Sequence, residues 1–189
     1  MSIIKLGDST WDEINKLDKQ NTVIIIPTGS IEQHGPHLPL KTDSFIISEI
    51  AFRSAQQAEK INKLINFLIL PVISIGRSPH HLDFIGSLSL SSSTFINTIE
   101  EICTCLFDYK FKRIILFNGH GGNEDCLKVA TRNIRDKINI LVCFLSYWSF
   151  ITDEINELRQ SSNGGICHAG EMETSMMLYL DKDSVRRKT

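Results

Sequence analysis

Four side chains of the types that ligate metals lie close together directly after the apolar run at residues 23–27. They are Glu32, His34, His37 and Asp43. Carboxylate oxygen and imidazole nitrogen are ligands that suit Zn²⁺ and Mn²⁺, and one carboxylate can bridge two ions. The stretch therefore indicates a metal site. A loop of solvated polar residues would have the same composition, so this stretch alone does not decide between the two interpretations.

A second polar cluster, Asn-Gly-His-Gly-Gly-Asn at residues 118–123, also comes directly after an apolar run. A glycine-rich turn between a strand and a helix can hold a phosphate on its backbone N–H groups, which would make this a nucleotide-binding module. The turn lacks the GxGxxG pattern and a Walker lysine, however. We predict instead that His120, at the carboxyl end of its strand, meets the carboxylates and imidazoles of the first loop.

The third cluster is His-Ala-Gly-Glu-Met-Glu-Thr-Ser at residues 168–175. On a helix His168 and Glu171 would share a face, whereas Glu173 would point away from Glu171. By this pattern at most one of the two glutamates reaches a given metal. Alternatively, both glutamates merely place negative charge in the first turn of a helix, which is common and mildly stabilising.

Strands and helices that alternate along the chain must position these clusters. The apolar patterns predict strands at residues 23–26, 67–73, 113–117 and 138–145, and helices at 44–60, 91–108, 124–137 and after His168, with a polar segment at 152–165. Strands separated by helices imply crossover connections and a parallel sheet. We therefore predict an α/β fold, a three-layer α/β/α sandwich with a mainly parallel sheet.

Composition limits the class of protein and its partners. The 189 residues are 42% hydrophobic and 22% charged, which predicts a single domain over residues 1–189 with a sizeable core. A net charge of −2 and a pI near 6.3 argue against nucleic acid and membrane surfaces and favour a small-molecule substrate. We find no apolar run of transmembrane length and no signal-peptide pattern, so we expect a cytoplasmic protein.

The five cysteines form an odd set without CxxC spacing, which argues against a disulfide framework and a cysteine zinc site. Cys167, beside His168, is the only one whose position suggests a nucleophile, and nothing nearby in the sequence would orient such a pair.

Together these motifs carry a resemblance. The stretch at residues 25–43, the NGHGGN turn, Leu-Ser-Tyr-Trp at 145–148 and the octet at 168–175 occur in the order found in the creatininase family, the creatinine amidohydrolases, which the chain resembles over nearly its whole length. That family also includes a deformylase of flavin and deazaflavin biosynthesis and the peptidase that trims the mycofactocin precursor.

The resemblance implies a hydrolase with two divalent metal ions, Zn²⁺ and/or Mn²⁺, with Fe²⁺ as an alternative. Four residues match family ligands by position, namely Glu32, His34, Asp43 as the bridge, and His120. Creatininases take another ligand from a glutamate two residues after the NGH histidine, and here that position is Gly122. We expect Glu171 to supply the missing carboxylate, with Glu173 as the alternative.

The chemistry that the resemblance implies is hydrolysis of an amide-type C–N bond in a small molecule, a cyclic amide or a formamide. Two nearby cations lower the pKa of a bound water to about 7 and polarise the substrate carbonyl. His168 matches a catalytic histidine and is expected to protonate the departing nitrogen. The alternatives are an inactive relative that binds metal without turnover and a peptidase of the mycofactocin-maturation type.

His81 and Trp148 match substrate-binding positions of the family. The residues that should read Phe-Pro-Gly-Thr are Phe-Ile-Gly-Ser at 84–87, and the creatininase tyrosine after NGH is Gly121, which argues against creatinine as the substrate. Family members are commonly homo-oligomers and usually continue beyond the point where this chain stops, so the chain is expected to be short at the C-terminus.

Overall fold

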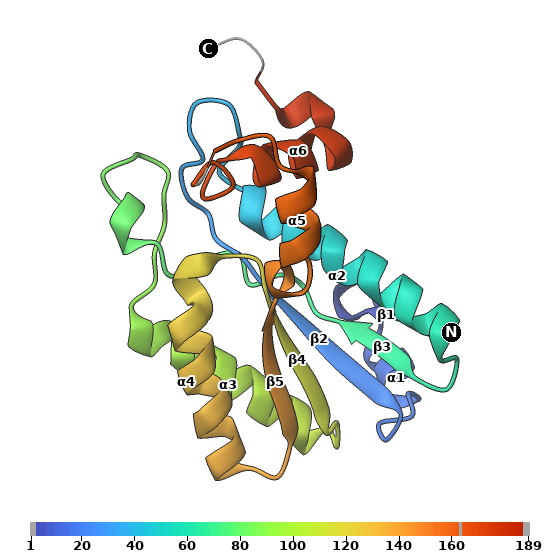
Figure 1. Ribbon diagram of the computed structural model, residues 1–189. Coiled ribbons are helices and arrows are strands. Elements are labelled where there is room, and N and C mark those ends of the chain that lie inside the picture. The colour runs from blue at the N-terminus through green and yellow to red at the C-terminus, as the bar shows by residue number, and fades with distance from the viewer. Residues whose placement is uncertain (1–2, 163, 187–189) are drawn as a thin grey trace.

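A computed structural model describes residues 3–162 and 164–186. Five parallel strands form one sheet in the order β1-β3-β2-β4-β5 (Figure 1). Their bounds are Ile3–Lys5 for β1, Thr22–Thr28 for β2, Asn66–Ile69 for β3, Arg113–Asn118 for β4 and Leu141–Ser146 for β5. The expected parallel sheet is confirmed.

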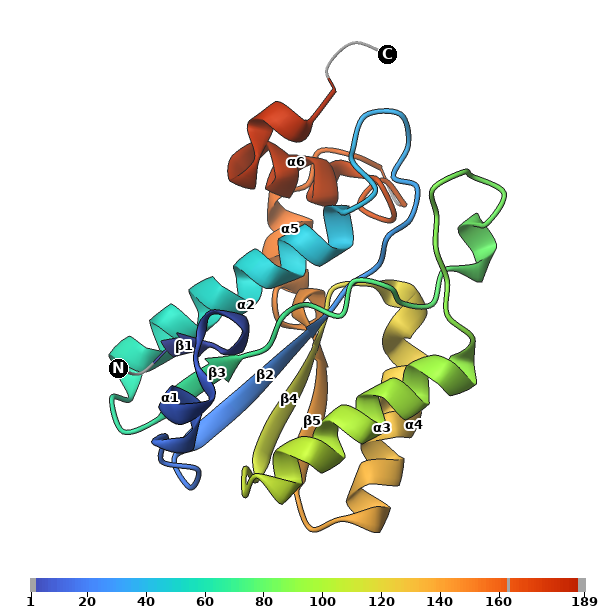
Figure 2. The same ribbon diagram turned by 180° about the vertical axis from the view of Figure 1, so that it is seen from behind.

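Helices cover both faces of this sheet, as the two opposite views of Figures 1 and 2 make plain. The helices are α1 (Trp11–Asn15), α2 (Thr42–Ile61), α3 (Ser92–Asp108), α4 (Glu124–Lys137), α5 (Thr152–Leu158) and α6 (Glu171–Leu180). Alternate residues of β2 supply the two cores. Ile24 and Ile26 lie in the core with α3 and α4, and Ile25 lies in the core with α2 and α6. The α/β/α layering is therefore confirmed.

The differences from the sequence-based elements are local. Helix α4 has the predicted bounds, whereas β3 ends at Ile69, before Pro71, which has no N–H to donate to a ladder. Strand β5 begins at Leu141 because Ile138 is still the C-cap of α4. The short β1 and α1, and α5 within the segment predicted only as polar, were not predicted. They are three, five and seven residues long, too short for a clear periodic signal.

The register of the central strands brings the polar clusters to one edge of the sheet. Thr28, the last residue of β2, pairs with Asn118, the last of β4, and Asn118 pairs with Ser146, the last of β5. The loops after these three strands therefore leave the sheet side by side, at the edge where open α/β sheets hold their ligands.

Within the described residues, every helix is too short or too polar to cross a lipid bilayer.

Candidate metal centre

The turn after β4 is held in place by side chains of its own sequence. Asn118 accepts a hydrogen bond from the His120 backbone N–H at 3.2 Å and donates to the His120 carbonyl at 2.8 Å. The glycine between them packs against α2, because a Cβ at Gly119 would lie 2.6 Å from Ile47 Cβ. The Asn-Gly-His sequence thus aims the His120 ring at the loop that follows β2.

The first group of ligating side chains joins that ring to two carboxylates. His120 Nδ1 lies 2.8 Å from Asp43 Oδ2 and 3.3 Å from Glu32 Oε1. Asp43 stands in the first turn of α2, where the helix dipole favours a negative charge. All three side chains are buried. Residues 32, 43 and 120 therefore meet as the sequence predicts.

The second group shares Asp43. Its Oδ1 lies 2.9 Å from His34 Nε2, and Glu173 Oε2 approaches the same nitrogen to 3.7 Å. The two groups, Glu32–Asp43–His120 and His34–Asp43–Glu173, each have ligand atoms within 4.8 Å of one another. Asp43 stands between them with one oxygen toward each, which is the arrangement of a carboxylate that bridges two ions.

The donor set fits divalent cations, because buried oxygens in it lack hydrogen-bond donors. Glu32 Oε1 and Asp43 Oδ2 have no hydrogen-bond partner among the described residues, and the short approach of His120 to Asp43 does not have hydrogen-bond geometry. An orphaned buried carboxylate oxygen is costly. Both oxygens lie within 3.3 Å of His120 Nδ1, and a cation bound among the three atoms would satisfy all of them.

Backbone carbonyls determine which nitrogen of each imidazole in these two groups is free to ligate a cation. His34 Nδ1 lies 3.0 Å from the Glu32 carbonyl, and His120 Nε2 lies 3.0 Å from the Arg77 carbonyl. A carbonyl only accepts, so these nitrogens carry the protons. In the neutral rings His34 Nε2 and His120 Nδ1 then present lone pairs to the carboxylates, as metal-ligating histidines do.

The charges of the cluster shift its pKa values strongly. Burial disfavours the charged form of His34, but the hydrogen bond and charge of Asp43 outweigh it and raise the His34 pKa to about 9. Burial also disfavours the charged form of His120, but the Asp43 carboxylate 2.8 Å from its Nδ1 outweighs burial and raises the His120 pKa. Burial and the charge of Asp43 raise the pKa of Glu173 to about 7. Without a cation the site thus retains protons that a cation would displace.

Glu171, the expected fifth ligand, lies elsewhere. Its carboxylate accepts hydrogen bonds from the backbone N–H groups of Gln160 and Ser161, at 2.9 and 2.8 Å, and so holds the segment before α6. The expectation assumed that His168 and Glu171 share a helix face. Helix α6 begins only at Glu171, and Ala169 before it has a left-handed φ of 54°, so helical spacing does not apply to His168. Glu173, the alternative, is the glutamate at the cluster.

Position 122 could not supply the carboxylate with this backbone. A Cβ on Gly122 would lie 2.2 Å from the Arg77 carbonyl oxygen and 2.5 Å from His120 Nε2. The turn packs so closely on residue 77 that only glycine fits. The third carboxylate near the cluster comes instead from Glu173 of α6, 3.7 Å from His34 Nε2.

His168 and Trp148 lie at a cavity of about 420 Å³ beside the cluster. His168 Nδ1 is 3.3 Å from Glu32 Oε1, and its ring stacks on His81 with centroids 4.3 Å apart. Trp148 follows β5 and packs edge-on against Tyr147. The cavity walls also include Ile155, Ile166 and Met172, so part of the wall beside the candidate ligands is apolar.

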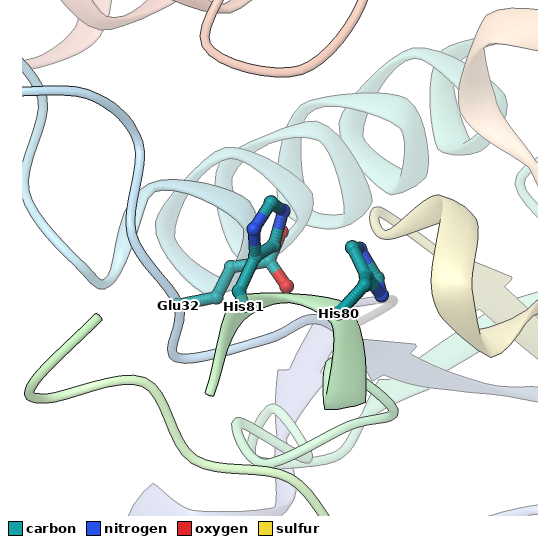
Figure 3. A group of neighbouring side chains, drawn as sticks. All are labelled: Glu32, His80 and His81. Atoms are coloured by element: carbon teal, nitrogen blue, oxygen red, sulfur yellow. The ribbon is translucent and has the colours of Figure 1, made fainter. Parts of the chain in front are cut away.

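Two further side chains gather here, His80 and Gln33, which the sequence motifs did not single out. The groups Glu32–His80–His81 and Glu32–His34–His168 also bring ligand atoms within 4.8 Å of one another. Figure 3 shows the first of these, with Glu32 on the loop after β2 and both histidines on the neighbouring segment. Gln33 bonds to His81 and His168, and His37 bonds to Thr174 of α6 rather than entering either group. The sequence carries no signal for Gln33 apart from its place between two ligands.

Comparison with known proteins agrees with this geometry. The sequence model of the family described as creatininase, creatinine amidohydrolase, matches residues 7–189. The mycofactocin precursor peptide peptidase of Mycobacterium ulcerans is 32% identical, over 95% of this chain and 67% of that protein. The creatinine amidohydrolase of Pseudomonas putida is 30% identical, over 95% of this chain and 73% of that protein.

A solved structure of a mutant creatininase of Zn-Zn type has the same fold, with a TM-score of 0.82 and 28% identity. The match covers 98% of this chain and 76% of that one. The motifs, the five-stranded parallel sheet and the matched family sequence together mean that this chain belongs to the creatininase family.

Proposed function

We propose that this chain hydrolyses a C–N bond of a small non-peptide amide, a cyclic amide or a formamide, at a centre for two divalent cations. Membership of the family makes it a hydrolase that acts on carbon–nitrogen bonds and favours this function over nucleotide binding. The observation that carries the proposal is Asp43, whose two oxygens each face a different imidazole and ligand group.

One cation would be held by Glu32, Asp43 and His120, and the other by His34, Asp43 and Glu173. Glu173 takes the place we expected for Glu171. Zn²⁺ and Mn²⁺ suit this mixture of imidazole and carboxylate, and Fe²⁺ is the alternative. Two such cations, when bound, lower the pKa of a water to about 7 and polarise a carbonyl oxygen.

The protein's own groups would orient the substrate and move protons. His168 lies at the cavity with Nδ1 toward Glu32, so Nδ1 is the atom that we propose to protonate the departing nitrogen. Trp148 and the apolar walls would cover the substrate and exclude water from it. His81 stacks on His168 and would hold that ring in place, although His81 itself does not line the cavity.

The size of the cavity supports a small molecule. A volume of about 420 Å³ lies near the lower end of ligand pockets, roughly 300 to 1,000 Å³. A second candidate, a peptidase of the mycofactocin-maturation type, is favoured by the 32% identity to such a protein. For that function the substrate would be a peptide end, with only its last residues inside the cavity.

We also propose a cytoplasmic location, which agrees with five free cysteines. Reduced thiols are the usual state there.

One experiment tests both metal content and reaction class. The purified protein would be stripped with a chelator, reloaded with Zn²⁺ or Mn²⁺, and assayed on cyclic amides, formamides such as p-nitroformanilide, and short peptides. We expect two ions per chain, and turnover of a non-peptide amide that the chelator removes and the metal restores. Cleavage of peptides alone would favour the peptidase, and two bound ions without any turnover would favour the inactive relative.

A further inference from the structure

The side chain of Gln33 makes three hydrogen bonds at the rim of the candidate metal centre. Its side-chain oxygen accepts from the Gly35 backbone N–H at 2.8 Å. Its nitrogen lies 2.9 Å from His168 Nε2 and 3.1 Å from His81 Nδ1. One amide therefore contacts two imidazoles, His81 and His168, that lie outside the two ligand groups sharing Asp43.

The bond to Gly35 fixes which end of the amide faces the histidines. A backbone N–H only donates, so the Gln33 oxygen must face it and the NH₂ group must face the rings. That NH₂ group has two hydrogens and accepts none. His168 Nε2 and His81 Nδ1 therefore both accept, and each neutral ring carries its proton on its other nitrogen.

Those other nitrogens face the metal centre. His168 Nδ1 lies 3.3 Å and His81 Nε2 lies 3.9 Å from Glu32 Oε1, and neither approach has hydrogen-bond geometry (Figure 3 shows His81 and Glu32). A nitrogen that carries a proton has no lone pair to give to a cation. His34 and His120 differ, because carbonyl acceptors behind them leave lone pairs toward the carboxylates.

We infer that Gln33 is a positioning residue that holds His81 and His168 with N–H groups toward Glu32, so that both serve as hydrogen donors and neither ligates a cation. Of the four groups of ligating side chains among the described residues, the two that contain His81 or His168 are thereby excluded as cation sites. The centre is limited to two cations by the amide of one glutamine.

The consequence for catalysis rests on the proposed function. With its proton on Nδ1, the neutral His168 ring can donate to the departing nitrogen without first becoming a cation, as neutral imidazoles do in other enzymes. In the overall hydrolysis one proton passes from the attacking water to the departing nitrogen. Nδ1 gives its proton to that nitrogen and recovers one that the water loses, so the C–N bond is replaced by C–O and the tautomer is restored.

The decisive test reads the tautomers directly. Long-range ¹H–¹⁵N spectra of the zinc-loaded protein report which nitrogen of each imidazole is protonated, with His81→Asn and His168→Asn to assign the signals. We expect protons on Nδ1 of His168 and Nε2 of His81. Gln33→Glu has the same shape but only accepts when ionised, so it should move both protons to the opposite nitrogens. A proton on His168 Nε2 in the native protein would overturn the inference.

Kinetics and metal content show whether Gln33 orients His81 and His168 or only supports the fold. On p-nitroformanilide we expect Gln33→Glu and the donor-free Gln33→Met to lower kcat by about 10- to 100-fold, with KM changed less than about twofold. Gln56→Glu, an exposed change on α2, should leave kcat, the tautomers and two bound zinc ions unaltered. If Gln33→Met lost zinc and raised KM while the His168 signals stayed as in the native protein, Gln33 would be a support of the fold and the inference would fail.

The two proposals can fail separately. The spectra need only folded, zinc-loaded protein, so a chain that turns over no substrate can still have the tautomers that Gln33 dictates. A chain that binds two ions and hydrolyses amides with His168 protonated on Nε2 would keep the proposed function and lose only this inference.

Discussion

Asp43 Oδ2 and His120 Nδ1 lie 2.8 Å apart in the interior of the protein without a hydrogen bond between them. The same carboxylate places its other oxygen 2.9 Å from His34 Nε2. This oxygen and this nitrogen are both atoms that can ligate a metal, and their close approach without a hydrogen bond is what a shared cation would explain. We conclude that this carboxylate is the centre of the candidate site.

Removing one oxygen of the Asp43 carboxylate should deprive one of the two cation sites of its shared ligand. Asp43→Asn replaces one oxygen by an NH₂ group, which cannot ligate, so we expect fewer than two ions per chain and a fall in kcat of more than about 100-fold. Elemental analysis of the purified variant and the amide assay measure these effects. Asp125→Asn, whose side chain is 98% exposed, is the matched control and should change neither. Full metal content in Asp43→Asn would contradict the bridging role.

Variants of the two glutamates in α6 test which of the two carboxylates binds metal. Glu173→Gln should lower the metal content from two ions toward one, because its carboxylate belongs to the group around His34. Glu171→Gln should keep both ions and instead loosen the segment at Gln160 and Ser161, seen as faster amide exchange there. The reverse pattern, with metal lost from Glu171→Gln only, would restore our first expectation from the sequence.

Glycine is required at one position of the turn after β4 and not at its neighbour. Gly122→Ala would push a methyl group against the Arg77 carbonyl and the His120 ring, so we expect a loss of about 1–3 kcal/mol in unfolding free energy and weaker metal binding. Gly121→Ala meets no atom within 4 Å and should be nearly neutral. Urea unfolding of both variants measures the difference. Equal stability of the two would mean that the turn can move away from residue 77.

The metal-free protein should lose stability as the pH rises. The pKa of His34 in the folded protein, about 9, exceeds the ordinary histidine value of 6.5, so its contribution to stability is complete below pH 6.5 and disappears as the pH rises through 9. The raised pKa of His120 acts in the same direction. We expect unfolding free energy to fall by about 2 kcal/mol between pH 6.5 and 9, within the range that such shifts produce.

Chelator-treated protein at the two pH values, unfolded in urea, measures this change. Zinc-loaded protein is the control and should show a smaller loss or a gain, because a cation replaces the protons and binds more tightly as they leave. Metal-free stability that rises from pH 6.5 to 9 would mean that the paired imidazoles do not hold their protons as the geometry indicates.

The amino-acid sequence determined the layers of the fold and most of the site. Apolar runs such as the one in β2 end at polar motifs, and parallel strands bring their carboxyl ends to one edge, so residues 32, 43 and 120 could be predicted to meet. Short elements such as β1 and α1 gave no clear signal, because three or five residues do not complete a recognisable period.

Only the tertiary structure decided which glutamate joins the cluster and what each histidine does. Helical spacing favoured Glu171, but α6 starts only at Glu171, three residues after His168, so the two side chains do not share a helix face. Backbone N–H groups at residues 160 and 161 already bind the Glu171 carboxylate. The roles of four nearby imidazoles depend on whether a carbonyl or the Gln33 amide stands behind each ring. Those partners are distant in the chain for His81, His120 and His168. Their positions follow from how the loops pack together, which local sequence does not encode.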